Sequence, residues 1–343
     1  MTDYQSQKIR NISFIAIIAV FFIHTLPQDS NRLSWVCFMQ HLIHTVSNFA
    51  VPFFFIISGY LFFMSKDSIK NVSIGIKKRI RTLGIPYILW CLLFLLQIWI
   101  ASFFKEPNRE YFAALNEGDI IDFIYHTFFG PLPYAFHLWY VRDLLGLVAL
   151  SPLIFLCQRK HPLVFLLIVI VICGLLKIIP WLSWPLTWFS LGSYFAFSKR
   201  DLLELRQKWI GVVMLIGYIG ITAWLISNGM FTTADRWYAF PVILLGVIGI
   251  WNTYDIIGIH RHIPGYLTEQ TFFLYCAHVP FLTIIATILF PIVKGHSVLE
   301  GFAYFFPALI TCCVLVIIAR WWQRLNRHSN LSSTIYKYLT GGR

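Results

Sequence analysis

His24 is the residue whose type and position are best suited to chemistry in this chain. It lies near the end of a hydrophobic run from Ile12 to Leu26 that contains no other ionisable residue. Because moving an ionisable side chain into a bilayer costs free energy, such groups usually mark a site or a pathway. An imidazole also titrates near neutral pH, which suits a general base. For His24 alone, a histidine bonded to a neighbouring helix is the alternative.

A second polar stretch begins another apolar run with His137 and continues through Trp139 to Arg142 and Asp143. Adjacent residues on a helix point in different directions, so we expect Arg142 and Asp143 to find separate partners on other helices. A structural ion pair and a polar cavity are both open interpretations of this stretch.

A third pair, Tyr275 and His278, lies about halfway along an apolar run, three residues apart. This spacing places both side chains on about the same face of a helix. The alternative to a functional role is a histidine bonded to a neighbouring helix.

The stretch from Pro52 to Leu61 combines a helix-kinking proline with the small pair Ser58 and Gly59, followed by Tyr60. Small residues permit close approach by another helix or by a ligand. Helix packing is favoured when the stretch is taken alone, with Ser58 and Tyr60 as candidate substrate contacts.

Four cations crowd into five residues at Lys77, Lys78, Arg79 and Arg81, shortly before Pro86. A positive anchor at the cytoplasmic face explains them. Their density also suits a phosphate-rich ligand, through charge-assisted hydrogen bonds. No glycine-rich phosphate loop accompanies them, so nucleotide hydrolysis is not indicated.

The elements that must position these residues are membrane helices. The chain is 58% hydrophobic and 12% charged, with a mean hydropathy of +0.70, whereas soluble domains carry about 25% charged residues. Uninterrupted apolar runs exclude the alternation of a β-barrel. We therefore predict one all-α, polytopic membrane domain over residues 1–343. Its ten predicted helices lie at about 11–28, 45–64, 83–104, 136–157, 162–180, 184–198, 208–228, 238–255, 268–291 and 301–322.

The distribution of Lys and Arg predicts the orientation of this bundle. With the N-terminus inside, 20 of the 27 cations fall in inside segments and six outside, so both termini are predicted to be cytoplasmic. This also explains the net charge of +12 without nucleic acid. His24 then lies in the outer half of the membrane. The longest outer loop, 105–135, is expected to form a short surface helix or a lid. No Cys/His spacing suggests a metal.

Taken in order, five stretches resemble the acyltransferase-3 family of integral membrane O-acyltransferases, over roughly residues 8 to 325. They are the first-span His24, Pro52 to Leu61, the basic stretch Lys77 to Arg81 before Pro86-Tyr87, His137 to Leu144, and Thr271 to His278. Ser13 and Ala16 stand where many members carry an Asp and an Arg.

This resemblance implies transfer of an acyl group, usually acetyl, from cytoplasmic acetyl-CoA to a hydroxyl of a cell-surface glycan or lipid-linked sugar at the cell membrane. It suggests His24 as the base, or as the carrier of an acyl group, and Lys78, Arg79 and Arg81 as contacts for the coenzyme A phosphates. Candidate substrate or oxyanion contacts are Ser58, Tyr60, His137, Trp139, Arg142, Asp143, Tyr275 and His278. A glycan transporter or flippase without acyl transfer is the alternative, and a membrane sensor without turnover is a third.

Overall fold

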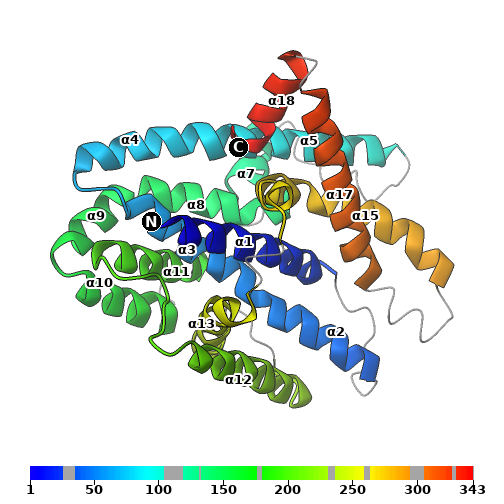
Figure 1. Cartoon of the computed structure of the whole chain (residues 1–343). Helices are drawn as coiled ribbons and strands as arrows, with labels where there is room; N and C mark the ends of the chain where they lie inside the picture. The colour runs from blue at the N-terminus through cyan, green and yellow to red at the C-terminus, as the bar shows by residue number, and fades with distance from the viewer. Residues whose placement is uncertain are drawn as a thin grey trace. The chain divides into compact units, whose positions relative to one another are not determined.

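The computed structural model describes residues 1–25, 35–103, 119–130, 133–175, 180–230, 236–258, 263–293, 305–326 and 330–342. Every regular element in these ranges is helical, which confirms the all-α prediction (Figure 1). The chain divides into two compact units, Met1–Lys66 with Ile154–Ile318 and Asp67–Leu153 with Ala319–Arg343. We call them the first and the second unit. The single membrane domain over residues 1–343 stays a prediction.

The first unit contains the N-terminal helix and most of the later helices. Its α-helices are α1 (Asp3–Ile23), α2 (Trp35–Val46), α3 (Ala50–Phe63), α10 (Pro162–Val169), α11 (Pro180–Phe197), α12 (Lys208–Ser227), α13 (Ala239–Ile257), α14 (Gly265–Thr268) and α15 (Thr271–Val293). A 3-10 turn, Ser47–Phe49, joins α2 to α3, and a π-helical stretch, Ile170–Leu175, follows α10.

The second unit contains α4 (Ile69–Arg79), α5 (Ile85–Ser102), α7 (Ile120–Phe128), α8 (Trp139–Ala149) and α18 (Asn330–Thr340). A π-helix, Ile80–Gly84, joins α4 to α5, and a 3-10 turn, Phe136–Leu138, precedes α8. Two helices, α9 (Ser151–Lys160) and α17 (Phe305–Leu325), carry the chain from one unit to the other.

Helix α1 is well defined at its beginning and along one face. The Thr2 hydroxyl accepts a hydrogen bond from the Gln5 backbone N–H at 3.2 Å, and the Gln5 side chain accepts one from the Thr2 N–H, which forms a capping box. Ile12, Ile17 and Phe21 are fully buried. The helix therefore presents a continuous apolar face to the rest of the first unit.

Close packing of α3 on α11 accounts for the small residues of the Pro52 stretch. A Cβ added to Gly59 would collide with the carbonyl of Phe189, and one added to Gly192 with the carbonyl of Ile56. For Gly59 the structure thus supports the helix-packing interpretation. Pro52 lies in the first turn of α3, where a proline is tolerated, and α2 to α3 forms one apolar helical stretch, Trp35–Phe63.

Each of the ten predicted windows contains a helix. Among the described residues, seven helical stretches are long and apolar enough to cross a membrane, and up to eight if a bent pair counts as one span. That pair is α8 with α9, which meet at 60° inside the predicted window 136–157. Pro152, in the first turn of α9, explains the break, since proline cannot continue the hydrogen bonding of α8. Ten spans and cytoplasmic termini stay predictions.

Three further helices, α4, α7 and α18, lie outside the ten predicted windows. Helix α4 is capped by the Ser68 hydroxyl, which accepts from the Asn71 N–H at 3.3 Å, so much of the basic stretch is helical. Helix α7, capped by Asp119, is the short helix expected within 105–135. Helix α18 follows the last window. Residues 26–34, and residues 104–118 and 131–132 around the predicted loop 105–135, lie outside the described residues.

Candidate functional site

His24 lies at the C-terminal end of α1, where its backbone N–H bonds to the carbonyls of Val20 and Phe21. Its side chain is partly exposed. Its ring lies 4.9 Å from the ring of His278 between centroids, with 49° between the ring planes. Two histidines that the sequence placed 254 positions apart are therefore neighbours in the first unit.

His278 is held from two sides within the first unit. It is fully buried in α15, its ring stacks on that of Phe21 at 5.2 Å and 9°, and its Nδ1 lies 2.5 Å from the Tyr275 carbonyl oxygen. A carbonyl oxygen only accepts hydrogen bonds, so this contact requires the proton on Nδ1. Neutral His278 then carries its lone pair on Nε2. The Tyr275 ring lies 5.9 Å from that of His278.

Arg142 and Asp143 pair with each other in the second unit. The Asp143 Oδ1 accepts from Arg142 Nε at 2.8 Å and from Nη2 at 2.6 Å, while Nη1 donates to the Gly130 carbonyl. The expectation of separate partners on other helices is therefore wrong for Asp143. The arginine side chain is long enough to fold back to its neighbour, and in a largely buried place a charge is stabilised by the nearest opposite charge.

His137 and Trp139 lie beside this ion pair in sequence. His137 is buried in the 3-10 turn before α8, and its ring lies 5.3 Å from that of Phe94 on α5. Trp139 begins α8. The structure thus gives His137 an aromatic neighbour within the second unit.

The basic segment, which we define as Lys77, Lys78, Arg79 and Arg81, ends α4 and enters the π-helix Ile80–Gly84. Lys77, Lys78 and Arg81 are exposed, and Arg79 is partly buried. Ion pairs between these four cations and acidic side chains are absent within the part of the chain that the structure describes. A π-helix often marks a functional position. The basic segment is therefore available to an anionic ligand.

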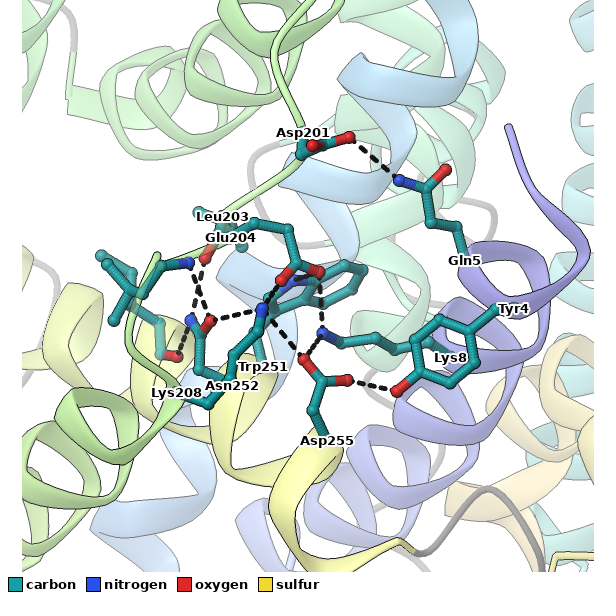
Figure 2. A network of polar contacts seen from close by, with 12 residues as sticks. Tyr4, Gln5, Lys8, Asp201, Leu203, Glu204, Lys208, Trp251, Asn252 and Asp255 are labelled. Atoms are coloured by element: carbon teal, nitrogen blue, oxygen red, sulfur yellow. Dashed lines mark hydrogen bonds and ion pairs between the residues drawn. The ribbon is translucent and has the colours of Figure 1, made fainter.

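A cluster that sequence reasoning missed lies at the beginning of α1 (Figure 2). The Lys8 Nζ is 2.9 Å from Glu204 Oε1 and 2.8 Å from Asp255 Oδ2, and Lys208 pairs with both carboxylates. We call these four residues the Lys8 cluster. From the sequence, Lys8 and Lys208 contributed only to the count of cations that predicts the orientation of the helices in the membrane. The partners of Lys8 lie 196 and 247 positions away, so no local spacing reveals them.

The structure thus brings some predicted site residues together. His24, Tyr275 and His278 meet in the first unit, which also holds Ser58 and Tyr60, both partly buried on α3. The second unit holds the Arg142–Asp143 pair, His137, Trp139 and the basic segment. Within the described residues, no group of three or more His, Cys, Asp and Glu side chains is arranged to hold a metal ion.

Comparison with known proteins identifies the class of protein. A family profile described as an acyltransferase domain matches residues 9–320, so the chain belongs to the acyltransferase-3 family. Together with its apolar helices, this membership makes the chain a multi-pass membrane protein of an acyl-transferring family.

A curated relative matches almost the whole chain. It is the succinoglycan biosynthesis protein ExoH of Rhizobium meliloti (strain 1021), 24% identical over 368 aligned positions that cover 98% of this chain and 92% of the relative. No solved structure shows a significant match.

Proposed function

We propose that this protein is an O-acyltransferase of the cell membrane that transfers an acyl group, acetyl in the first instance, from cytoplasmic acyl-coenzyme A to a hydroxyl of a polysaccharide or its lipid-linked precursor. Family membership supports acyl transfer. The relative is named for the biosynthesis of succinoglycan, which supports a polysaccharide acceptor. The observation that carries the assignment of the site is the contact between His24 and His278 at 4.9 Å.

His24 is the base in this proposal. Its neutral imidazole takes the proton of the acceptor hydroxyl as that oxygen attacks the thioester carbonyl carbon. The new C–O bond forms, the C–S bond breaks, and the departing thiolate of coenzyme A receives the proton. A positioned base of this kind contributes about 10²–10⁴ to the rate.

His278 and Tyr275 support the base from one side. With its proton on Nδ1 held by the Tyr275 carbonyl, His278 directs an electron-rich Nε2 away from that contact, which suits stabilisation of a protonated neighbour. Burial of His278 strengthens such an interaction, because the effective dielectric constant is low. The stacking on Phe21 and the contact with the Tyr275 carbonyl favour one orientation of this buried ring.

The donor is proposed to bind through its phosphates at the basic segment. Lys78 and Arg81 are exposed and carry no ion pair among the described side chains. Binding of a phosphate group at these cations therefore breaks no existing ion pair. Arginine suits phosphate through two parallel N–H donors. The role of Arg142 as an oxyanion contact stays a prediction from the sequence; within the second unit its guanidinium pairs with Asp143.

Mass spectrometry of the surface polysaccharide tests this function. We expect a deletion strain to lose one type of acyl substituent, with the mass difference naming the acyl group and fragmentation locating its position on the sugar. The polysaccharide chain itself should still reach the surface in normal amount. Unchanged substitution together with lost export would contradict acyl transfer and support the transporter alternative.

A further inference from the structure

We propose that Lys8 is a positioning residue for His24, because its buried ion pairs fix the position of α1 along its own axis. The inference rests on the proposed role of His24 as base. It assigns a purpose to the Lys8 cluster, which lies at the opposite end of α1 from the candidate site and which the proposed chemistry does not use.

The contacts of Lys8 surround its ammonium with two carboxylates and an aromatic ring (Figure 2). The side chain is 0% exposed, and its Nζ lies between the carboxylates of Glu204 and Asp255 and 4.3 Å from the ring centre of Trp251. The Trp251 indole N–H donates to the same Glu204 oxygen at 2.9 Å. A buried charge is costly unless these contacts are kept, so their geometry is tightly enforced.

The backbone that carries the acidic partner Glu204 is itself held in place by hydrogen bonds. Lys8 therefore pairs with a carboxylate whose position is fixed. Asn252 on α13 donates to the Leu203 carbonyl at 2.9 Å and accepts from the Leu205 N–H at 2.9 Å, so it holds both neighbours of Glu204. Leu203 has a left-handed φ of 54°, which a non-glycine residue adopts only when its surroundings impose it. The loop before α12 is therefore fixed by α13.

Neighbouring contacts extend the same anchor along α1. The Tyr4 hydroxyl donates to Asp255, and the Asn11 amide donates to the Tyr254 hydroxyl at 2.8 Å. Together with Lys8, these residues tie the first part of α1 to the end of α13. Two consecutive residues of α13, Tyr254 and Asp255, thus contact three positions on α1.

Helix α1 transmits this position to the candidate site. It is continuous from Asp3 to Ile23, and His24 lies 16 residues after Lys8, about 24 Å along the axis at a rise of 1.5 Å per residue. Phe21 and His24 at its end both contact the buried His278. A displacement of about 1 Å of a catalytic group can cost about 10²-fold in rate. A shift of α1 along its axis is therefore expected to lower kcat more than it changes KM for the donor.

The test compares two lysines of the same cluster, only one of which lies on α1. We expect Lys8→Met, measured on the folded fraction of purified full-length protein, to lower kcat at least about tenfold with KM for acetyl-coenzyme A unchanged. Lys208→Met removes the same charge from α12 and should keep kcat within about twofold while lowering thermal stability. Lys8→Arg should recover much of the lost kcat, because it restores a cation on α1.

Two further variants guard against simple unfolding. Arg10→Met removes an exposed cation two residues away on α1 and should change neither kcat nor stability. If Lys8→Met alone does not fold, the neutral triple variant Lys8→Met, Glu204→Gln, Asp255→Asn removes the unpaired charges and is expected to fold. Its kcat should still be low, since the ion pairs of Lys8 that fix α1 along its axis are then absent.

The outcomes separate this inference from the function on which it rests. Wild-type kcat in folded Lys8→Met or in the triple variant, with His24→Ala inactive, would overturn the positioning role and leave the proposed function standing. Equal losses of kcat in the Lys8 and Lys208 variants would also overturn it, because a purely structural cluster predicts that result. Full activity of His24→Ala would instead contradict the proposed base.

Discussion

The Lys8 cluster and the basic segment hold similar cations in opposite circumstances. In the first unit, Lys8 and Lys208 share two carboxylates, and Lys8 is completely buried. In the second unit, three of the four cations of the basic segment are exposed, and none has an ion pair among the described side chains. A cation that is paired with carboxylates can hold helices together, whereas a cation without an ion pair can bind an anionic ligand. The difference supports a structural role for the Lys8 cluster and is consistent with the proposed binding of the donor at the basic segment.

The sequence alone does not separate these two sets. Both lie in segments that the charge distribution predicts to be cytoplasmic, where counts of Lys and Arg set orientation whether or not the cations are paired. The separation depends on Glu204 and Asp255, which reach Lys8 only through the tertiary fold.

The largest expected effect that tests this comparison concerns stability. Lys8→Met removes two charge-assisted hydrogen bonds and leaves the partly exposed carboxylates of Glu204 and Asp255 paired with Lys208, so we expect about 3 kcal/mol of destabilisation. The exposed Lys78→Met should change stability by less than about 1 kcal/mol. Thermal unfolding in detergent measures both. Equal small effects would show that the Lys8 cluster is not the stronger anchor.

The next effect concerns the donor. Removing Lys78 and Arg81 together should weaken acetyl-coenzyme A binding at least about tenfold, because a charge-assisted hydrogen bond contributes about 1.5–3 kcal/mol. Isothermal titration with the intact protein measures the dissociation constant. Lys8→Met, as the matched loss of a cation, should bind the donor like the wild type. An unchanged dissociation constant in the double variant would remove the basic segment from the donor site.

A smaller effect on stability is expected from Asn252, whose side chain holds the two neighbours of Glu204. Asn252→Ala leaves the Leu203 carbonyl and the Leu205 N–H without their side-chain partner and should destabilise the protein by about 1–3 kcal/mol. Asn228→Ala, at an exposed asparagine after α12, is the control and should be close to neutral. Similar melting temperatures for both variants would argue that the loop before α12 is held by other contacts.

The smallest effect concerns salt. Raising the ionic strength from about 0.1 M to 1 M shortens the screening length from about 10 Å to 3 Å, which weakens exposed charges much more than buried ones. We expect KM for acetyl-coenzyme A to rise several-fold while the melting temperature changes little. A melting temperature that falls as steeply as donor affinity would indicate that the Lys8 cluster is open to solvent.

Much of the fold and part of the site could be predicted from local sequence. Apolar length located a helix in each of the ten windows, because burial of apolar side chains in lipid depends on composition alone. Isolation within apolar runs singled out His24 and His278, and the structure brings them into contact. The acyltransferase-3 resemblance was confirmed by the family match over residues 9–320.

The remainder depends on contacts that local patterns do not encode. The polar helix α4, which is capped by the Ser68 hydroxyl, falls outside the hydropathy windows. Arg142 pairs with Asp143 because its long side chain folds back to its neighbour. The spacing of residues along a helix gives the direction of each side chain at its Cβ and not this folding. The Lys8 cluster required residues almost 200 and 250 positions apart to meet.

The most direct test of the central claim is acyl transfer by purified His24→Ala, with His161→Ala as the control. His161 is an exposed histidine that precedes α10. Release of free coenzyme A from acetyl-coenzyme A, measured with the polysaccharide of the deletion strain as acceptor, reports the reaction. We predict a rate at least about 10²-fold below wild type for His24→Ala and a wild-type rate for His161→Ala. A wild-type rate for folded His24→Ala would contradict the assignment of His24 as the base.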